Sequence, residues 1–261
     1  MGINLYDYGA RWYDAAVGRW TSVDPLAEKY VNSGTSSYAY TWNNPVIFID
    51  PTGRQGEDTY GVNSDGYIVK IDDKKYYDEN GKEVDMLVSG HKLRYYRRGR
   101  RKGQIKNDHI MVEKGRLRAG AKKNRPMEIG GKPYEYTHMV FGNNDSGAKK
   151  LFSFLAEETD VEWSIYQIDR KFAKQTEIFS SHMHDKEVVG ASFLMDKLKA
   201  NVGKEKLIYH MHSHPPTYKM GDESGLEPSY EDIQFAKGIR QIEGNESARF
   251  FIHFGLQKRE Y

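Results

Sequence analysis

Histidines occupy every second position of a predicted strand near the end of the chain: His210, His212 and His214. Side chains two residues apart on a strand share a face, and their Cα atoms lie about 6.5–7 Å apart. Two imidazoles at that separation can bind one cation with metal–nitrogen distances of about 2.0–2.1 Å. Pro215 and Pro216 end the strand and put His214 at its tip. The spacing indicates a metal site, and histidines on an exposed strand face are the alternative interpretation.

A carboxylate follows at the start of the next predicted helix. Ser229 has the position of an N-cap residue, and Asp232 is the third residue of a helix that runs to Arg240. Serine followed three residues later by an acid is also the pattern of a capping box. The two roles are compatible, because a helix N-terminus can hold the carboxylate rigidly. Two histidines and one aspartate leave the fourth tetrahedral position of a zinc ion open for water, which is the catalytic pattern.

These residues need a fold that brings a strand and the following helix together. The hydrophobic periodicity of the last half of the chain predicts alternating helices and strands. The predicted helices are 148–156, 194–198 and 229–240, and the predicted strands are 161–168, 176–179, 206–212 and 248–254. Such alternation is typical of an α/β or α+β sandwich, in which helices flank a sheet.

His-Ser-His-Pro at residues 212–215, followed by Pro-Ser-x-x-Asp at residues 228–232, resembles the motif of the JAB/JAMM (MPN) metallopeptidases. The resemblance covers residues 148–254 and preserves the order of helix, glutamate-bearing strand, histidine-bearing strand, helix and final strand. It implies a JAB/MPN-like sheet with flanking helices and a bound Zn²⁺ ion. The loop between the two motifs is longer than in the family, so we expect a flexible insertion there and a different substrate groove.

The same resemblance implies a role for each site residue. His212 and His214 match the histidine ligands of the zinc ion, and Asp232 matches the carboxylate ligand. Glu162 matches the general base that activates the zinc-bound water, and Ser229 matches the serine that stabilises the oxyanion. The implied reaction is hydrolysis of an amide bond, either peptide or isopeptide. Without the resemblance, Glu162 would be interpreted as an acid on an edge strand.

Three further histidines match no ligand of this motif. His210 lies one alternation too early, and we expect it to pack beneath the site or to orient a ligand. His182 and His184 form a second His-Met-His run, which has neither a following proline nor a placed carboxylate. We predict that this second run is a surface loop.

The first 53 residues have a different character, with aromatic runs between closely spaced turn residues that predict short strands and tight turns. Four ordered motifs stand out: Leu-Tyr-Asp-Tyr-Gly-Ala-Arg-Trp-Tyr-Asp at 5–14, Gly-Arg-Trp-Thr-Ser-Val-Asp-Pro-Leu at 18–26, Asn-Asn-Pro at 43–45 and Ile-Asp-Pro-Thr-Gly at 49–53. Together they resemble the Rhs repeat-associated core. In that family the core ends a β-rich shell of repeats, and a variable toxin domain follows it.

Some Rhs cores cut themselves near this boundary with aspartates of the core. Asp24 and Asp50 match positions within the motifs and are the candidate self-cleavage residues here. The alternative is that both aspartates only shape Asp-Pro turns. Arg54 stands where the family has leucine.

Residues 54–132 form a segment between these two parts. Its first half alternates short β-like runs with Asn-Ser-Asp-Gly and Glu-Asn-Gly turns, which predicts hairpins. Its second half holds 14 lysines and arginines against two acids between Lys92 and Arg125. Tyr95 and Tyr96 lie inside this basic run, and cations with aromatic rings can bind nucleic acid. A solvated basic connector is the alternative and the one we favour, because the run holds no cluster for cutting nucleic acid.

Composition excludes several classes of protein. The chain has 261 residues and no cysteine, which excludes disulfide scaffolds, thiol nucleophiles, Cys-ligated zinc and the cysteine-containing zinc deaminases. No apolar run approaches the ~20 residues of a membrane-spanning helix. The first residues lack the basic and apolar regions of a signal peptide. We therefore expect a protein without a membrane span, whose export depends on another component.

These patterns predict three parts: an Rhs core remnant at 1–53, a hairpin-containing basic connector at 54–132 and a JAB/JAMM-like metallopeptidase domain at 133–261. The two resemblances imply the zinc-dependent toxin end of an Rhs-type polymorphic toxin, delivered into a target cell by a secretion system. The expected partners are a protein or peptide substrate, a cognate immunity protein and the Rhs shell of a longer parent protein. Two alternatives stay open: a nucleic-acid-binding or nuclease effector that uses the basic run, and a catalytically inactive JAB-like binding module.

Overall fold

The computed structural model describes most of the chain after residue 58 and short stretches before it. The described residues are 5–7, 11–23, 36, 38, 59–72, 76–90, 94, 105–215, 225–255 and 257–261. Asp24 and Asp50 lie outside the described residues, as do residues 216–224 of the expected insertion and residues 95–104 of the basic run. Self-cleavage by the two aspartates therefore stays a prediction.

A six-stranded mixed sheet forms the centre of the C-terminal half. Its strands in spatial order are β11 (Thr137–Gly142), β13 (Ala173–Ser180), β12 (Ser164–Arg170), β14 (Glu205–Ser213), β15 (Arg249–Phe254) and β16 (Gln257–Glu260). Neighbouring strands are antiparallel except for β14 and β15, which are parallel. A parallel pair needs a crossover connection, and here the crossover contains the helix α4 (Tyr230–Arg240).

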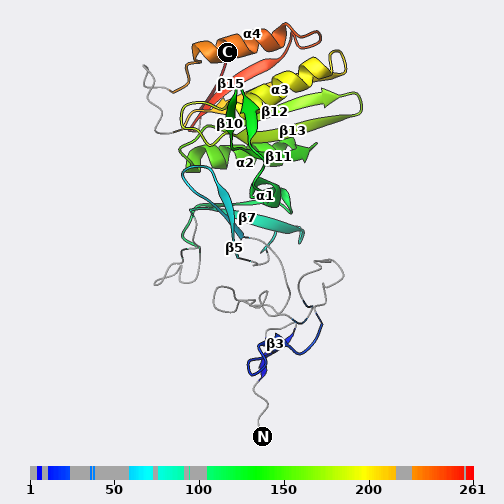
Figure 1. Ribbon diagram of the computed structural model, residues 1–261, viewed down its shortest axis with the longest axis vertical. Helices are drawn as coiled ribbons and strands as arrows, with labels where there is room; N and C mark the ends of the chain where they lie inside the picture. The colour runs from blue at the N-terminus through cyan, green and yellow to red at the C-terminus, as the bar shows by residue number, and fades with distance from the viewer. Residues whose placement is uncertain are drawn as a thin grey trace.

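Helices cover both faces of this sheet (Figure 1). The helix α2 (Asp145–Glu158) packs on one face, where Leu151, Phe152 and Leu155 are fully buried. The helix α3 (Val189–Ala200) packs on the other face together with α4. The mixed α/β class with helices flanking a sheet, as predicted from hydrophobic periodicity, is therefore present. β11 and β16 are strands that the sequence analysis did not predict.

Alternation along β14 decides which side chains face which helix. Tyr209 and Met211 belong to the apolar core on the α2 side. His210 faces the opposite side, where its ring centroid lies 5.1 Å from that of Phe235 on α4. His212, two residues further along, shares that side with His210. The histidines of β14 therefore point toward the helix that carries Asp232.

A second sheet lies on the far side of α2 (Figure 1). Its strands are β4 (Thr59–Val62), β5 (Ile68–Asp72), β6 (Tyr76–Tyr77), β7 (Glu83–Ser89) and β8 (His109–Glu113). β4 with β5 and β6 with β7 are antiparallel pairs joined by short turns. The hairpins predicted for this segment are therefore present.

The second sheet shares one apolar core with α2 and the central sheet. Tyr60, Val62 and Leu87 are buried in it, as is Leu117 of the short helix α1 (Arg116–Gly120). The segment predicted as a connector thus contains folded structure that packs directly on the C-terminal half. The reason is that α2 presents apolar side chains to both sheets. A domain boundary at residue 132 stays a prediction.

Two small antiparallel sheets complete the described structure. One is the hairpin of β9 (Met127–Ile129) and β10 (Lys132–Tyr134). The other consists of β1 (Leu5–Asp7), β2 (Trp12–Asp14) and β3 (Arg19–Trp20), near the N-terminal end in Figure 1. These last three are the short strands and tight turns predicted from the aromatic runs. In the described part of the chain, no helix is long and apolar enough to span a bilayer.

Candidate metal centre

β14 and the residue that follows it place two imidazoles side by side. His212 and His214 are buried, with exposed fractions of 4% and 3%. The backbone N–H of His214 donates to the His253 carbonyl at 2.9 Å, which holds the chain beside β15. His214 Nδ1 lies 2.7 Å from the Gly225 carbonyl oxygen, and only a protonated nitrogen can donate to a carbonyl. Nε2 of His214, which is unprotonated in the neutral imidazole, faces the site 3.3 Å from His212 Nε2.

Gly225 can present its carbonyl to His214 because of its backbone conformation. Its φ of +62° lies in the left-handed region, where residues with a Cβ are strained. A Cβ at this position would also come within 2.7 Å of the Phe254 ring. Glycine at residue 225 thus fixes the tautomer of His214.

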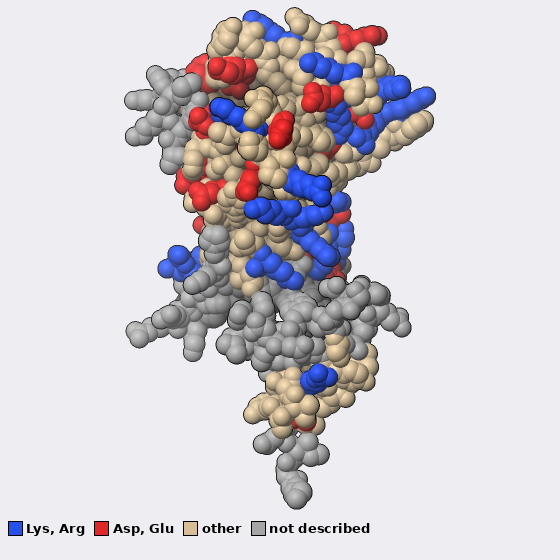
Figure 2. Space-filling view, viewed as in Figure 1, with Lys and Arg blue, Asp and Glu red and all other residues tan. Residues whose placement is uncertain are grey.

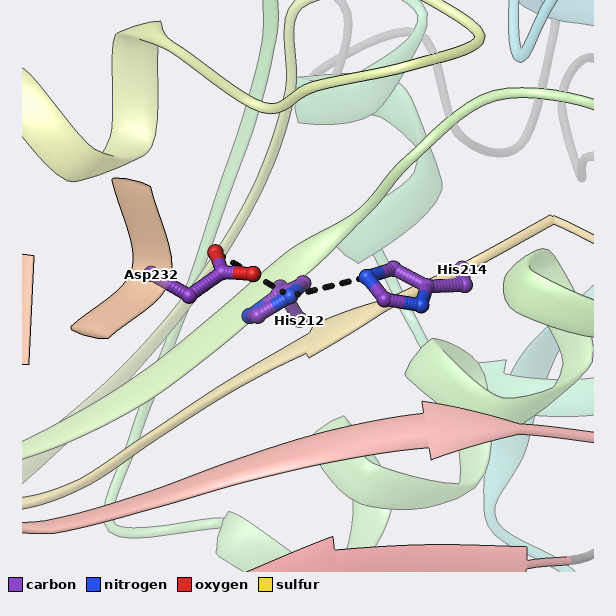
Figure 3. A group of neighbouring side chains, drawn as sticks. All are labelled: His212, His214 and Asp232. Carbon is purple, nitrogen blue, oxygen red and sulfur yellow. Dashed lines mark hydrogen bonds and ion pairs between the residues drawn. The ribbon is translucent and has the colours of Figure 1, made fainter. Parts of the chain in front are cut away.

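The first turn of α4 brings Asp232 to the two imidazoles (Figure 3). Ser229 caps the helix: its Oγ accepts from Asp232 N at 3.1 Å, and Asp232 Oδ2 accepts from Ser229 N at 2.8 Å. This reciprocal pair is the capping box that the sequence indicated. The other oxygen, Oδ1, lies 3.4 Å from His212 Nε2. The cap and the contact with His212 therefore coexist in one carboxylate.

The separations between these atoms match the needs of a small dication. A tetrahedral ion with bonds of about 2.0–2.1 Å holds its ligand atoms about 3.3–3.4 Å apart. The two measured edges are 3.3 Å between the histidine nitrogens and 3.4 Å between His212 and Asp232. The potential ligand atoms of all three residues lie within 4.8 Å of one another. The donor set of two imidazoles and one carboxylate therefore fits zinc.

Electrostatics around the cluster favour ionised Asp232. Burial opposes ionisation of this carboxyl, but the hydrogen bond and charge of His212 and the two hydrogen bonds with Ser229 lower the pKa of Asp232 far below its usual value. Burial likewise opposes the charged form of His212, yet the Asp232 carboxylate and the charge of Glu162 raise the pKa of His212 above its usual value. In the metal-free protein, the Asp232 carboxylate thus favours the protonated form of His212.

Glu162 lies beside the cluster, two residues before β12 begins. Ser164 of β12 pairs with His212, and the ladder continues because Ser213 N donates to the Trp163 carbonyl at 2.8 Å. Glu162 therefore lies opposite His214 and on the same face as Ser164. Its backbone is fixed on both sides, since its N–H donates to the Met183 carbonyl at 2.9 Å and its carbonyl accepts from Ser180 Oγ at 2.8 Å.

The environment of Glu162 shifts its acidity. Burial raises the pKa of Glu162 to about 8, His212 partly offsets the shift, and the charges of Asp232 and Glu187 add to it. Its exposed fraction is only 5%. General bases work best when their pKa lies near the operating pH, and a dication at the cluster would favour the ionised form. Glu162 has the burial and placement of a proton-transfer group.

Residues 140–237 match the family model JAB-like toxin 1. The match supports a JAB-like toxin domain in this chain and spans the five residues singled out by sequence: Glu162, His212, His214, Ser229 and Asp232. The chain is also similar to Salivary gland surface protein 1 of Aedes aegypti, at 46% identity over 50 residues. That similarity covers 19% of this chain and 1% of the mosquito protein. No solved structure matches the chain.

Within the segment that matches the JAB-like toxin model, His210 is not part of the His–Asp cluster. Its ring packs among the rings of Phe235, Phe250 and His212, with centroids 5.1, 6.1 and 6.0 Å away. Neither ring nitrogen has a hydrogen-bond partner in the described part of the chain. Burial, together with the charge on His212, lowers the pKa of His210 to about 3. His210 is a neutral side chain packed beneath the site.

The second His-Met-His run lies in a loop that the β4–β5 turn partly covers. His182 stacks on Tyr67 at 4.0 Å, and its nitrogens contact the Asp65 carbonyl at 2.9 Å and Thr137 Oγ1 at 3.1 Å. His184 is exposed and contacts the Asp160 carbonyl at 2.6 Å. The prediction of a surface loop is confirmed: residues 181–187 belong to no helix or strand, and His184 is exposed. The β4–β5 turn partly covers the ring of His182, which is half-buried. Among the described residues, only His212, His214 and Asp232 form a three-ligand group.

The described part of the basic run is partly neutralised by acids. Lys114 pairs with Glu83 at 2.7 Å, and Lys123 pairs with Glu135 at 3.1 Å. Figure 2 shows basic and acidic side chains interspersed over much of the visible upper part of the molecule. This charge distribution favours a solvated surface over a continuous basic groove in the described part.

Two acids on the α3 side of the sheet, the half-buried Glu187 and the buried Glu177, were missed by sequence analysis. Glu187 accepts from Ser164 Oγ at 2.9 Å and from Ser181 Oγ at 2.8 Å, and it also accepts from backbone N–H groups at the start of α3. It thus links α3 to the strand beside His212. Sequence analysis missed Glu187 because its partner on β12, Ser164, lies 23 residues earlier in the chain.

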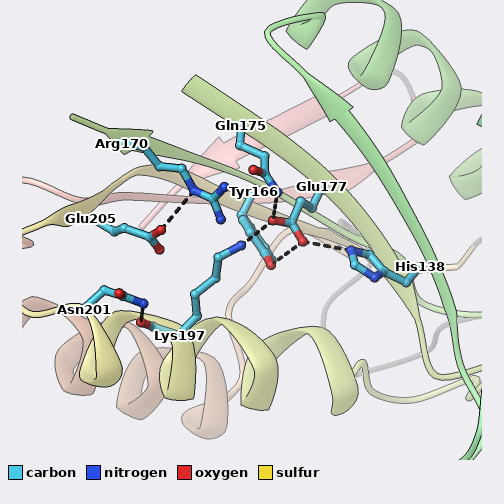
Figure 4. Close-up of polar contacts among 8 residues, drawn as sticks. All are labelled: His138, Tyr166, Arg170, Gln175, Glu177, Lys197, Asn201 and Glu205. Atoms are coloured by element: carbon cyan, nitrogen blue, oxygen red, sulfur yellow. Dashed lines mark hydrogen bonds and ion pairs between the residues drawn. The ribbon is translucent and has the colours of Figure 1, made fainter. Parts of the chain in front are cut away.

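The other missed acid is Glu177, at the centre of a closed polar network (Figure 4). It accepts from Lys197 Nζ at 2.5 Å and from Tyr166 Oη at 3.1 Å, and His138 Nε2 lies 2.8 Å away. Burial opposes its ionisation, but His138 and Lys197 lower the pKa of Glu177 to about 2. Because Lys197 lies on α3 and Glu177 lies on β13, their ion pair links α3 to the sheet. Both oxygens of the Glu177 carboxylate have partners.

Proposed function

We propose that the chain is a zinc-dependent peptidase or isopeptidase with a JAB/MPN-like fold. The observation that carries the proposal is the convergence of His212, His214 and Asp232 at separations that suit one tetrahedral ion. A zinc ion bound there would lower the pKa of a water molecule and polarise a scissile carbonyl. Three protein ligands leave one tetrahedral position open, as in other catalytic zinc sites.

The chain's own residues supply the proton transfers. Glu162 takes a proton from the attacking water and passes it to the nitrogen of the leaving amine as the C–N bond breaks. Ser229 Oγ accepts from Asp232 N, so its hydroxyl hydrogen stays free to donate to the developing oxyanion. Loss of one such donor costs about 2.7–4 kcal/mol of barrier in serine proteases.

The biological setting is part of the same proposal. The match to a JAB-like toxin model supports a toxin effector, and the motifs of residues 1–53 resemble an Rhs core. We infer that the chain is the toxin end of an Rhs-type polymorphic toxin that is delivered into target cells by a secretion system. A producing cell would then need a cognate immunity protein.

The metal site is tested by metal analysis of the full-length chain. After incubation with zinc and desalting, we expect about one zinc per wild-type chain and a large loss in His212→Ala and Asp232→Ala. His184→Ala is the matched control, because this histidine is exposed and lies outside the cluster. Equal zinc in all four proteins would remove the proposed site.

Activity is tested separately, by inducing each variant in a bacterial host and following growth. Wild type is expected to arrest growth, and Glu162→Gln is expected to lose this effect while it retains zinc. Equal toxicity of the two proteins would favour the inactive binding module. A salt-sensitive DNA mobility shift without a metal requirement would favour the nucleic-acid hypothesis.

A further inference from the structure

A tyrosine outside the matched toxin segment reaches the candidate site. Tyr261 follows β16, the edge strand beside β15, and its N–H donates to the Phe250 carbonyl at 3.0 Å. This bond extends the β15–β16 ladder by one pair. Phe250 in turn pairs with His210 of β14. Residues opposite one another in a sheet share a face, so Tyr261 lies on the face that bears the histidines.

Two contacts fix the Tyr261 ring beside that face. The ring meets His212 edge-on, with centroids 6.3 Å apart and an interplanar angle of 78°. It also lies 6.1 Å from the Phe250 ring. The backbone carbonyl of Tyr261 accepts from Arg240 Nη2 at 3.2 Å, which ties the residue to the end of α4. The ring is therefore held against a candidate ligand by two elements that also build the site.

The hydroxyl of Tyr261 is buried and has no hydrogen-bond partner in the described part of the chain. Buried phenols usually have such a partner, and an unpaired buried donor is destabilising. Burial raises the pKa of Tyr261, and the charges of Asp232 and Glu162 raise it further. The hydroxyl is therefore a buried hydrogen-bond donor that lacks an acceptor among the described residues.

We propose that the Tyr261 hydroxyl is a catalytic residue that donates a hydrogen bond to the carbonyl oxygen of the amide substrate. The inference rests on the proposed peptidase function and adds a second donor to Ser229. The two donors differ in their existing contacts. Ser229 Oγ already accepts a hydrogen bond in the α4 cap, whereas the Tyr261 hydroxyl makes no hydrogen bond within the described fold.

The test compares full-length wild type, Tyr261→Phe and Tyr230→Phe, each loaded with zinc. Tyr230 is the matched control, since it stands next to Ser229 but is 72% exposed. The probe is acetohydroxamate, a small zinc-binding molecule with an amide-like carbonyl, and its affinity is measured by calorimetry. We expect Tyr261→Phe to bind the probe about three- to tenfold more weakly, the effect of one hydrogen bond. Tyr230→Phe should match wild type.

Two further readouts separate a catalytic donor from a structural residue. Tyr261→Phe should bind zinc as tightly as wild type, and its metal-free form should unfold at the same or a higher denaturant concentration, because an unpaired buried hydroxyl is gone. Three results in this variant would each overturn the inference about Tyr261 without affecting the proposed function: unchanged probe affinity, weaker zinc binding, or an unfolding midpoint at lower denaturant concentration. A wild-type chain without zinc would overturn the proposed function and this inference with it.

Discussion

Asp232 has two roles that a single substitution can separate. Its Oδ2 accepts from Ser229 N at 2.8 Å in the helix cap, while Oδ1 lies 3.4 Å from His212 Nε2. Asparagine in the same rotamer keeps an oxygen for the cap but turns an amide nitrogen toward His212. An amide nitrogen cannot bind the ion, so we expect Asp232→Asn to lose zinc and keep its helix. Ser229→Ala is the converse change, because it removes the cap and leaves the carboxylate.

The expected magnitudes follow from these contacts. Structural zinc sites with four ligands bind with about 10–16 kcal/mol, so one ligand accounts for about 2.5–4 kcal/mol, or about 10²- to 10³-fold in affinity. Asp232→Asn should lose that affinity, and its metal-free stability should fall by about 1.5–3 kcal/mol, because the substitution removes the charged contact with His212 as well as the charge at the helix N-terminus. Ser229→Ala should lose about 1 kcal/mol of stability through the cap and retain zinc affinity within a few-fold.

Both quantities can be measured on the full-length chain. Denaturant unfolding of the chelator-treated protein gives the stability, and competition with a chromophoric chelator gives the zinc affinity. Wild-type zinc affinity in Asp232→Asn would refute the assignment of this carboxylate as a ligand. An equal loss of zinc in Ser229→Ala would show that the cap, rather than the charge, determines binding.

Three other substitutions test the surroundings of the cluster in the metal-free protein. The folded pKa of Glu162, about 8, lies above its unfolded value of 4.5, so wild-type stability should fall as pH rises from about 4.5 to about 8. Glu162→Gln should make this decline in the unfolding midpoint shallower, and the remaining decline comes from His212, whose pKa is also raised. An unchanged pH profile would contradict the prediction. His210→Phe should raise the free energy of unfolding by about 1 kcal/mol, because the carbon atoms of the phenylalanine ring replace two buried nitrogens that have no hydrogen-bond partner. A fall of that size would show that His210 has a polar partner. Gly66→Ala should reduce the free energy of unfolding by at least about 1 kcal/mol more than Gly81→Ala. Both glycines have a positive φ, but only at Gly66 would the added Cβ lie 2.6 Å from Val161. Equal shifts in melting temperature would mean that backbone strain accounts for the whole effect.

The sequence predicted the features of this site that depend on local patterns. Alternating histidines placed the imidazoles on one face of β14, and the spacing of Ser229 and Asp232 predicted the capping box, which is present. Hydrophobic periodicity predicted α2, whose buried side chains follow helical spacing, and the apolar run after it predicted β12, where five consecutive residues are buried. Glu162 could not be selected from its own surroundings, and only the family resemblance identified it.

Features that depend on long-range pairing were not predictable. β4 pairs in parallel with the distant β7, and no alternation pattern within either strand names its partner. For the same reason the packing of the second sheet on α2 was missed, as was the approach of Tyr261 to His212. Glu187 was missed because its partner on β12, Ser164, lies 23 residues earlier in the chain.

The burial of α2 between two sheets determines where this protein can be divided. Leu151, Phe152 and Leu155 belong to the same core as Tyr60 and Leu87. A recombinant fragment that starts at residue 133 would leave part of this core in contact with water, and exposed apolar surface of that kind promotes aggregation. An expression boundary placed before Thr59 keeps both sides of the helix covered, so preparations intended for enzymology need the N-terminal sheet as well as the histidines.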